Sequence, residues 1–594
     1  MSSLSGHLTI LMGKAFEALE LPIIYARVGV SAAGQDSEFQ CNGAMPCAKV
    51  AKKNPRDIAQ DIVAELLKIA DGDIFAELSV GGPGFINIKL KPEYIADHLK
   101  GVAADDRCGV PETGAGQTVM LDYGGPNIAK AMHVGHLRSS IIGDTLRRIC
   151  GFAGYKAIGD VHMGDWGTPM GMILSELELM KFDGEITMDM LAEIYPKAST
   201  ACKEDEARMA LAREATKKLQ DGVPEYRETW QKFIDVSIAG MKENFDALGV
   251  HFDEWKGESD AHPYIADMVE DLKSRGIAKQ DQGAWIIDVQ EATDNKKIPP
   301  LILLKSDGAV LYSTTDLATI IDRMICHTPV KIIYVVDQRQ SLHFEQVKRA
   351  AEKSDYVDQG CVNLWFHEDG IHNGQGIRTE IVFAGFGTMN GTDGKPFKTR
   401  AGGVMRLEDL IAMAKDKAHQ RLNEAELAQD MDEAEREDVA HKVAIAALKF
   451  ADLQNNRISD YVFDIDRMTS FEGKTGPYLL YQAVRIQSLL RKAGIEGDVD
   501  CDQFIIDDAD KELAMWIGEM PYHFDGALRN YTPHILCDYA YKLAQEFSSF
   551  YGNCHILSEE NEAVKASRLA LCALTHKQLT LILGLLGVEV PARM

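Results

Sequence analysis

The chain has 594 residues, of which 46% are hydrophobic and 26% are charged. At about 150 residues per domain, this length predicts roughly four structural units and excludes a small module held together by disulfides or metal. The 63 Lys and Arg residues against 90 Asp and Glu residues give a net charge of −27. Such a charge repels phosphate at long range, so it argues against indiscriminate binding to nucleic acid or to an anionic membrane.

The 11 cysteines are scattered, and the closest pair, Cys41 and Cys47, has five residues between its members. The sequence therefore predicts neither a CxxC zinc site nor a redox pair, and free thiols fit a reducing cytoplasm. The first 21 residues lack the basic flank and apolar core of a secretion signal. No apolar run approaches the roughly 18 residues of a membrane span. We therefore expect a cytoplasmic protein without a membrane segment.

Residues 1–110 are predicted to form a small α+β domain. Helical spacing occurs at the start and over residues 55–69, and a glycine-rich turn at 81–84 precedes an alternating strand at 86–90. From residue 117 to about 403, short apolar strands alternate with helices, as at 119–123, 156–162 and 331–336. Such runs are typical of a parallel sheet that is buried on both faces.

Residues 181–241 are charged and helical, which predicts an insertion or a solvated hairpin between the halves of the sheet; plain scaffold is the simpler interpretation. After residue 406, helical spacing replaces the strand signals, as between Val443 and Phe450. The last helix has Thr575 as a candidate N-cap, with Gly587 and Pro591 after its end. Residues 406–594 are therefore predicted to be all-α.

Residues 119–148 are the most informative stretch. An apolar strand leads through a Pro-Asn turn into an amphipathic helix whose start carries His133 and His136. Unpaired N–H groups and the positive end of the dipole at a helix start attract phosphate. Gly135 leaves room for a flat adenine. A bare His-x-Gly-His pattern is more often an ordinary helix start or half of a metal site, but the strand, the turn and the Lys130 cation favour phosphate stabilisation here.

Residues 126–144, PNIAKAMHVGHLRSSIIGD, resemble the signature of class I aminoacyl-tRNA synthetases in the form found in arginyl-tRNA synthetases. The resemblance extends over nearly the whole chain. It implies a multidomain α/β protein with an appended domain that binds the tRNA elbow at residues 1–110. It also implies a Rossmann-like parallel-sheet catalytic domain at 111–405 and an all-α anticodon-binding bundle at 406–594.

Residues 394–403, GKPFKTRAGG, resemble the KMSKS loop of the family. A lysine-rich turn by itself is usually solvated, but its place after the histidine motif favours binding of the β- and γ-phosphates. The resemblance implies a catalytic set of Lys130, His133, His136, Lys395 and Lys398. It implies an ATP-binding set of His133, Gly135, His136, His343, Lys395 and Lys398, with Mg²⁺ accompanying ATP and with neither zinc nor an organic cofactor.

A pocket for a guanidinium needs carboxylates and an aromatic wall. Tyr312 and Asp316 have the i, i+4 spacing that places them on one helix face, and they resemble the Tyr-x-x-x-Asp element of the family. A Gly-Glu-Ser segment supplies Glu258 as a second carboxylate. Taken singly, each carboxylate is more often a helix cap or a surface charge. The resemblance implies an arginine-binding set of Asn127, Glu258, Tyr312, Asp316 and Gln340.

Two further stretches bear on the resemblance to the family. Many relatives have serine before the Pro-Asn pair, where this chain has Gly124 and Gly125, so a backbone group would have to replace the serine hydroxyl. Residues 162–168, HMGDWGT, resemble the central strand and turn of the family, and core packing explains them equally well. We assign no catalytic role to them.

The contacts with tRNA are implied by resemblance at both ends of the chain. Aromatic rings can stack on unpaired bases, although tyrosines at helical spacing are more often part of a core. The implied contacts are Phe39, Gln40 and Asn42 at the N-terminal end, and Tyr478, Tyr481, Tyr551 and Met594 at the C-terminal end. A basic strip at residues 49–56 lies near the first group; such a strip is usually a solvated face.

The resemblance implies an enzyme that joins L-arginine to tRNA(Arg) through arginyl-adenylate, with release of pyrophosphate and with activation that needs tRNA. We expect a monomer with no DNA or membrane partner. Two alternatives remain open. An adenylate-forming ligase for a small acceptor would not need the helical domain. A regulator that binds tRNA or arginine without turnover would not need the histidines and loop lysines.

Overall fold

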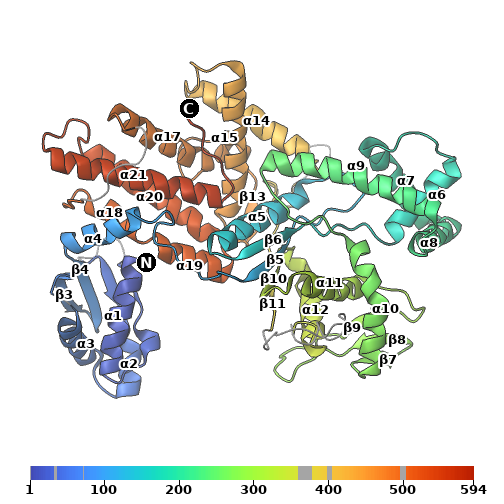
Figure 1. Ribbon diagram of the computed structural model, residues 1–594, viewed down its shortest axis with the longest axis horizontal. Helices are drawn as coiled ribbons and strands as arrows, with labels where there is room; N and C mark the ends of the chain where they lie inside the picture. The colour runs from blue at the N-terminus through green and yellow to red at the C-terminus, as the bar shows by residue number, and fades with distance from the viewer. Residues whose placement is uncertain are drawn as a thin grey trace.

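A computed structural model describes residues 2–31, 37–70, 72–358, 378–395, 397, 405–495 and 504–594. In Figure 1 the N-terminal unit lies at the lower left, next to the C-terminal helices, and a parallel sheet lies near the centre. A long helical arm, α6 to α9, extends to the right. The confirmed fold class is therefore multidomain α/β, with an all-helical C-terminal part.

The N-terminal unit is a small α+β fold. Its antiparallel sheet has the order β1 (Val28–Val30), β2 (Phe39–Cys41), β4 (Phe85–Leu90) and β3 (Phe75–Gly81). The sheet is accompanied by α1 (Leu4–Ala18), α2 (Ala44–Ala51) and α3 (Pro55–Ile69), and α4 (Pro92–Ala103) follows. Strand β4 alternates half-buried and buried residues, so one face forms the core. The two predicted helices and the predicted strand in this unit are confirmed.

The central sheet is parallel, in the order β11 (Glu380–Phe383), β10 (Lys331–Tyr334), β5 (Thr118–Asp122) and β6 (Lys156–Asp160). All three strands predicted from the apolar runs are present. Helices α5 (Leu137–Phe152), α11 (Tyr312–His327) and α12 (Ser341–Lys353) accompany it. The carboxyl ends of its strands meet at one edge, which is where ligands bind in open α/β sheets.

Two additions extend the central region. The arm consists of α6 (Thr168–Met180), α7 (Met188–Glu204), α8 (Glu206–Gln220) and α9 (Pro224–Leu248), so the helices begin earlier and end later than the predicted 181–241. Apolar residues such as Leu191 and Phe233 are buried between these helices, which excludes a fully solvated hairpin. The second addition comprises α10 (Glu258–Ser274) and an antiparallel sheet of β7 (Ala278–Asp281), β8 (Ala284–Ile287) and β9 (Leu301–Leu304).

In residues 405–495 and 504–594, the C-terminal part is helical, as predicted, apart from the two-residue strand β13 (Tyr461–Val462), which pairs with β12 (Met389–Asn390). Its helices are α14 (Leu407–Glu424), α15 (Glu433–Leu453), α16 (Ile465–Met468), α17 (Gly476–Lys492), α18 (Lys511–Gly518), α19 (Met520–Asn530), α20 (His534–Asn553) and α21 (Glu562–Leu585). The predicted cap at Thr575 is wrong. Asn561 caps α21, and the buried Thr575 hydroxyl donates to the Leu571 carbonyl at 2.7 Å within the helix.

Helix α5 joins the sheet to the C-terminal helices at both of its ends. Near its start, Arg138 Nε lies 3.0 Å from Asp452 Oδ2 on α15, and both side chains are buried. Near its end, the Arg148 guanidinium donates to the Gly584 carbonyl on α21 at 3.3 Å. The helix that follows the histidine motif is therefore fixed to two elements of the C-terminal part.

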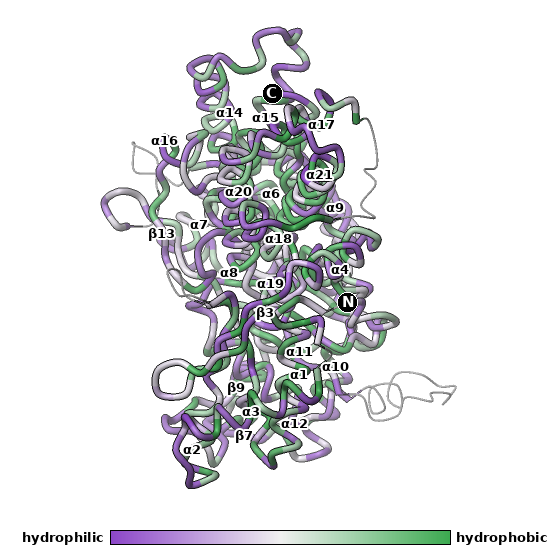
Figure 2. The backbone as a smooth tube through the Cα atoms, turned by 90° about the vertical axis from the view of Figure 1, so that its left-hand side faces the viewer, coloured by the Kyte–Doolittle hydropathy of each residue, from purple (hydrophilic) through white to green (hydrophobic). Residues whose placement is uncertain are grey.

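Figure 2 shows hydrophobic and hydrophilic residues alternating along most of the helices. This alternation is expected for amphipathic helices that bury one face. Within the described residues, no helix combines the length and apolar character needed to cross a bilayer.

Candidate active site

The two signature histidines lie at the carboxyl edge of the sheet, where η2 (Val134–His136) leads into α5. Their rings stack with centroids 4.0 Å apart. The Gly135 N–H donates to His133 Nδ1 at 3.0 Å, and the His133 N–H donates to His136 Nδ1 at 3.1 Å. Because each Nδ1 accepts a hydrogen bond, each neutral ring carries its proton on Nε2. Both rings can therefore act as Nε2–H donors.

Burial keeps both rings neutral. Desolvation and the nearby Lys130 charge lower the pKa of His133. Desolvation and the neighbouring His133 lower the pKa of His136 to about 3. A Cβ at Gly135 would lie 2.7 Å from His133 Cε1, so a side chain there would displace the first ring. The pair is thus arranged to donate hydrogen bonds to developing negative charge without transferring a proton.

A cavity of about 300 Å³ adjoins His133 and Gly135. Phe386, Met389 and Phe397 supply apolar walls that suit a purine ring. Most residues of the lining were not predicted from the sequence: Val134, Arg138, Asp337, Arg339, Phe386, Gly387, Thr388, Met389 and Phe397. Most of these residues follow β10 or β11 and reach the histidines only through the pairing of parallel strands. In the sequence, the ends of the apolar strand runs are the feature that could have indicated these residues.

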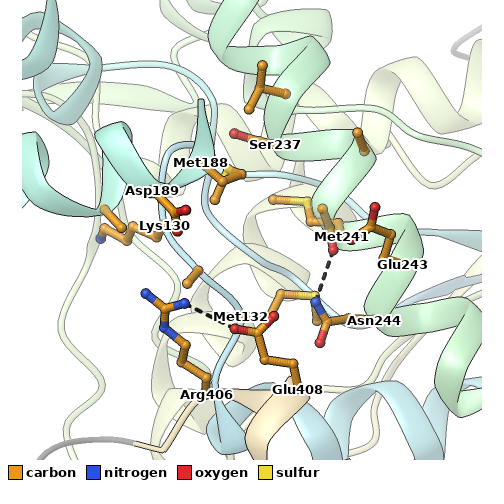
Figure 3. Close-up of a pocket in the computed structure, with 15 residues that line it drawn as sticks. Lys130, Met132, Met188, Asp189, Ser237, Met241, Glu243, Asn244, Arg406 and Glu408 are labelled. Atoms are coloured by element: carbon orange, nitrogen blue, oxygen red, sulfur yellow. Dashed lines mark hydrogen bonds and ion pairs between the residues drawn. The ribbon is translucent and has the colours of Figure 1, made fainter. Parts of the chain in front are cut away.

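Lys130 borders a different cavity, of about 320 Å³. Figure 3 shows Lys130 and Arg406 at this cavity, with Arg406 paired to Glu408 at 3.0 Å. The Lys130 ammonium lies 4.5 Å from the centroid of the Tyr195 ring on α7. The structure therefore holds Lys130 against the helical arm, and its predicted contact with phosphate stays a prediction.

Of the two predicted loop lysines, Lys395 is described and Lys398 lies outside the described residues. Lys395 is exposed on a turn in which the Gly391 N–H donates to the Lys395 carbonyl at 2.8 Å. Further along the chain, the Met405 carbonyl accepts from the Val134 N–H at 3.1 Å. The segment that follows the loop is therefore anchored beside the histidine motif.

Two predicted carboxylates and a tyrosine come together on α10 and α11. Helix α11 begins at Tyr312, so Tyr312 and Asp316 share a face, as the spacing predicts. Burial, opposed by the His162 charge and reinforced by Asp165 and Asp316, raises the pKa of Glu258 to about 7. Burial and the Glu258 charge raise the pKa of Tyr312. These groups can offer a guanidinium two carboxylates and an aromatic wall.

His343 lies beside one of the two predicted carboxylates, and its predicted contact with ATP stays a prediction. Its Nε2 lies 2.5 Å from Asp316 Oδ2, and it is absent from the described lining of the cavity beside Gly135. Asn127 and Gln340 are exposed at the same sheet edge, Asn127 after β5 and Gln340 at the end of η3 (Gln338–Gln340). The structure thus groups His343 with the carboxylates and leaves both amides open to a ligand.

A buried charge cluster lies at the ends of β5 and β6. Arg323 on α11 donates to Asp122 Oδ2 at 2.6 Å and to Asp160 Oδ2 at 2.7 Å. His162 Nδ1 lies 3.7 Å from Asp160 Oδ2. The two aspartates and His162 are close enough to share a metal ion, but the guanidinium already bridges the carboxylates. The cluster ties α11, which carries Tyr312 and Asp316, to the sheet.

The predicted tRNA contacts in the N-terminal unit face different ways. Phe39 is 1% exposed, which contradicts the prediction of a contact through its ring. Alternation along β2 directs Phe39 inward and the next residue outward. Gln40 donates to Asn87 Oδ1 at 2.9 Å, and Asn42 is exposed. The exposed Asn42 side chain is therefore open to a partner, whereas the Gln40 amide is engaged by Asn87 on the neighbouring strand.

The predicted C-terminal contacts lie on α17, on α20 and at the chain end. Tyr481 is 37% exposed, and Tyr478 is half-buried with its ring 5.8 Å from that of Tyr541. The Arg485 guanidinium lies 4.4 Å from the centroid of the Tyr551 ring. Met594 is half-buried. Helices α17 and α20 thus present aromatic rings together with a cation, a combination that suits single-stranded RNA.

Three family models match the chain in succession. The N-terminal domain of arginyl tRNA synthetase matches residues 8–90, the catalytic domain of class I (R) tRNA synthetases matches 98–465, and the DALR anticodon binding domain matches 479–594. Arginine–tRNA ligases from Maricaulis maris and Hyphomonas neptunium are 46% and 45% identical to the chain, with complete coverage of both partners.

Solved structures agree with these matches. The arginyl-tRNA synthetase of Plasmodium falciparum superposes with a TM-score of 0.83 at 25% identity, and both chains are covered completely. The Thermus thermophilus enzyme has the same fold, with a TM-score of 0.80 at 22% identity over both complete chains. The full-length identity to the curated relatives, together with a signature that sits at the carboxyl edge of a parallel sheet, shows that the chain belongs to the class I arginyl-tRNA synthetase family.

Proposed function

We propose that this sheet edge carries out the arginine–tRNA ligase reaction. ATP and L-arginine form arginyl-adenylate and pyrophosphate, and the arginyl group then passes to the 3′-terminal adenosine of tRNA(Arg). The observation that carries the proposal is the convergence, at one edge, of two neutral Nε2–H donors with the carboxylates Glu258 and Asp316. Donors of the first kind suit a phosphoryl transition state, and the carboxylates suit a guanidinium.

The residues divide between the two substrates. His133 and His136 donate to the α-phosphate, the cavity beside Gly135 receives adenine, and Lys130, Lys395 and Lys398 balance the outer phosphates. Glu258 and Asp316 accept the guanidinium, Tyr312 lines its pocket, and Asn127 and Gln340 hold the amino end. The arginine carboxylate attacks the α-phosphorus and pyrophosphate leaves, so no side chain has to become a covalent nucleophile.

The remaining parts of the proposal concern partners and setting. Mg²⁺ accompanies ATP, and neither zinc nor an organic cofactor is required. The proposed tRNA contacts are Gln40, Asn42, Tyr478, Tyr481, Tyr551 and Met594. We propose a cytoplasmic monomer with no DNA partner, divided at residues 110 and 405, in which bound tRNA is needed for activation.

ATP–pyrophosphate exchange tests the function. We expect exchange with arginine plus tRNA(Arg), and none with lysine. A half-buried carboxylate pair that a single-headed ammonium leaves partly unmatched disfavours lysine by several kcal/mol, on the order of 10³-fold or more. Exchange that needs no tRNA would favour an adenylate-forming ligase for a small acceptor. Binding of tRNA without exchange or charging would favour a regulator.

His343 provides a prediction that separates the two substrate sites. Because its imidazole contacts Asp316, we expect His343→Ala to raise KM for arginine roughly tenfold to a hundredfold, since a hydrogen bond to a charged group is worth roughly 1.5–3 kcal/mol. KM for ATP should remain close to that of the unmodified protein. The measurement is exchange with each substrate varied in turn. A larger rise in KM for ATP would instead support the ATP contact predicted from the sequence.

A further inference from the structure

The segment at residues 160–166 has no role in the proposed reaction, yet it lies between two parts of the arginine site. On one side it pairs with the signature turn. The Gly164 N–H donates to the Pro126 carbonyl at 3.2 Å, and the Ile128 N–H donates to the Gly164 carbonyl at 3.1 Å. A Cβ on Gly164 would lie 2.3 Å from Asn127 Oδ1. Only glycine at this position lets the Asn127 amide rest against the segment.

On its other side the segment pairs with the chain that leads into α10. The Met163 N–H donates to the Lys256 carbonyl at 2.8 Å, and the Glu258 N–H donates to the Met163 carbonyl at 3.1 Å. The Trp166 backbone N–H interacts with the Glu258 carboxylate and acts to lower its pKa, against the effect of burial. The backbone of Glu258 and its carboxylate are therefore both held by the segment that holds Asn127.

Asp165 fixes the first turn of α10 directly. It is 2% exposed, and its Oδ1 accepts from the Ser259 N–H at 3.0 Å. Its Oδ2 accepts from the Ser259 hydroxyl at 2.5 Å. A Cβ on Gly257 would lie 2.5 Å from Asp165 Cγ, so the glycine makes room for this carboxylate. A negative group at a helix start also interacts favourably with the helix dipole.

Core packing alone does not account for an acid at this position. A buried carboxylate is costly, and an apolar side chain of similar size would fill the space without that cost. Asp165 also raises the pKa of the neighbouring Glu258, so it makes the ionisation of that carboxylate harder. Its two bonds to Ser259 set the position of the residue next to Glu258, which is an effect that packing would not supply.

We propose that Asp165 is a positioning residue for the amino-acid substrate. It fixes Glu258 relative to Asn127, so that the guanidinium end and the amino end of one arginine are held at a set separation. Asp165 then contributes to the selection of arginine over lysine without contacting either. This proposal rests on the proposed function, because it assigns Glu258 and Asn127 to the two ends of arginine.

The test is ATP–pyrophosphate exchange by the full-length protein with tRNA(Arg), with arginine and ATP varied separately. Asp165→Ala should raise KM for arginine on the order of tenfold to a hundredfold, because small misplacements of a binding group are costly. KM for ATP should change by less than about twofold, and the preference for arginine over lysine should fall. Asp165→Asn should recover part of the loss, because its amide oxygen can still accept from the Ser259 N–H.

Asp271→Ala is the matched control. Asp271 lies near the other end of α10, its side chain is 9% exposed, and its Oδ2 accepts from the Tyr356 hydroxyl at 2.8 Å. Its loss should lower the melting temperature and leave KM for arginine unchanged. Equal rises in both KM values for Asp165→Ala, or the same rise for Asp271→Ala, would show a purely structural role and overturn the proposal.

A milder variant keeps the proposal testable if Asp165→Ala fails to fold. Ser259→Ala removes the bond between the hydroxyl and Asp165 and keeps the backbone bond. It should raise KM for arginine severalfold, and an unchanged KM would overturn the proposal. If the unmodified protein shows no exchange with arginine, the proposed function fails. Calorimetric titration of arginine then decides the positioning role separately: weaker binding by the Ser259 variant supports the role, and equal binding overturns it.

Discussion

Replacement of His136 by alanine is expected to lower kcat for ATP–pyrophosphate exchange by about 10²-fold to 10³-fold, the usual effect of removing one oriented donor from a transition state. KM for ATP and for arginine should change little. The His136 ring holds its Nε2–H in place through a bond between its Nδ1 and the His133 N–H, so the donor is already aligned before charge develops. Steady-state exchange with both substrates varied measures the effect.

Two observations would check this account of His136. His136→Gln places an amide N–H near the position of Nε2, so it should recover part of the lost kcat. Because burial and His133 lower the pKa of His136 to about 3, kcat should show no transition between pH 6 and pH 8 that depends on this residue. A transition that disappears in the glutamine variant would point to acid–base chemistry instead.

Lowering the pH from 8 to 6 is expected to raise KM for arginine about tenfold, because a carboxyl with pKa near 7 passes from about nine-tenths to about one-tenth ionised over this range. Burial, Asp165 and Asp316 raise the pKa of Glu258 to about 7 in the empty site, against the effect of the His162 charge. A raised pKa means that Glu258 binds a proton below pH 7, and the neutral form attracts a guanidinium weakly. KM for ATP should not follow this pH dependence.

The variant Glu258→Gln tests whether ionisation of Glu258 causes this pH dependence. It should raise KM for arginine at pH 8 by roughly 10²-fold to 10³-fold, since truncation of a buried charged partner costs about 2–5 kcal/mol. It should also abolish the rise between pH 8 and pH 6. Burial acts to lower the pKa of His162, but the neighbouring Asp160 and Asp122 outweigh it and raise the pKa to about 9. His162 therefore stays charged between pH 6 and pH 8. The control is Asp260→Asn, a change in the same helical turn, which should keep the pH dependence. If KM for arginine still rises between pH 8 and pH 6 in Glu258→Gln, Glu258 is not the group responsible.

The sequence predicted those elements whose pattern is local. The strand that became β10 is an almost continuous apolar run, and a strand buried on both faces leaves that signature wherever it lies in a sheet. The i, i+4 spacing of Tyr312 and Asp316 predicts a shared face if a helix begins there, and α11 does begin at Tyr312. Alternation along a short strand assigns neighbouring residues to opposite faces, which agrees with the burial of Phe39 beside the half-buried Gln40, but no strand was predicted at these residues.

Features that depend on distant partners could not be predicted. Phe386 and Met389 reach His133 only because β10 and β11 extend the sheet beside β5. Threonine is a common N-cap residue, but the Thr575 hydroxyl donates to the Leu571 carbonyl within α21, and Asn561 caps this helix much earlier in the chain. The contact between Lys130 and Tyr195 brings helix α7 of the arm against the signature turn, far along the chain. Each depends on a tertiary contact that local spacing does not encode.

The two attachments of α5 allow it to transmit a movement of the C-terminal helices to the histidine motif at its start. With 16 residues at about 1.5 Å each, the helix is about 24 Å long. If Arg148 and Gly584 act as the pivot, His136 lies about 18 Å away along the helix, and a tilt of only about three degrees moves it by about 1 Å, a displacement that can cost on the order of 10²-fold in rate. A small rotation of the C-terminal helices therefore reaches the phosphate donors through one rigid element, without a rearrangement of the sheet.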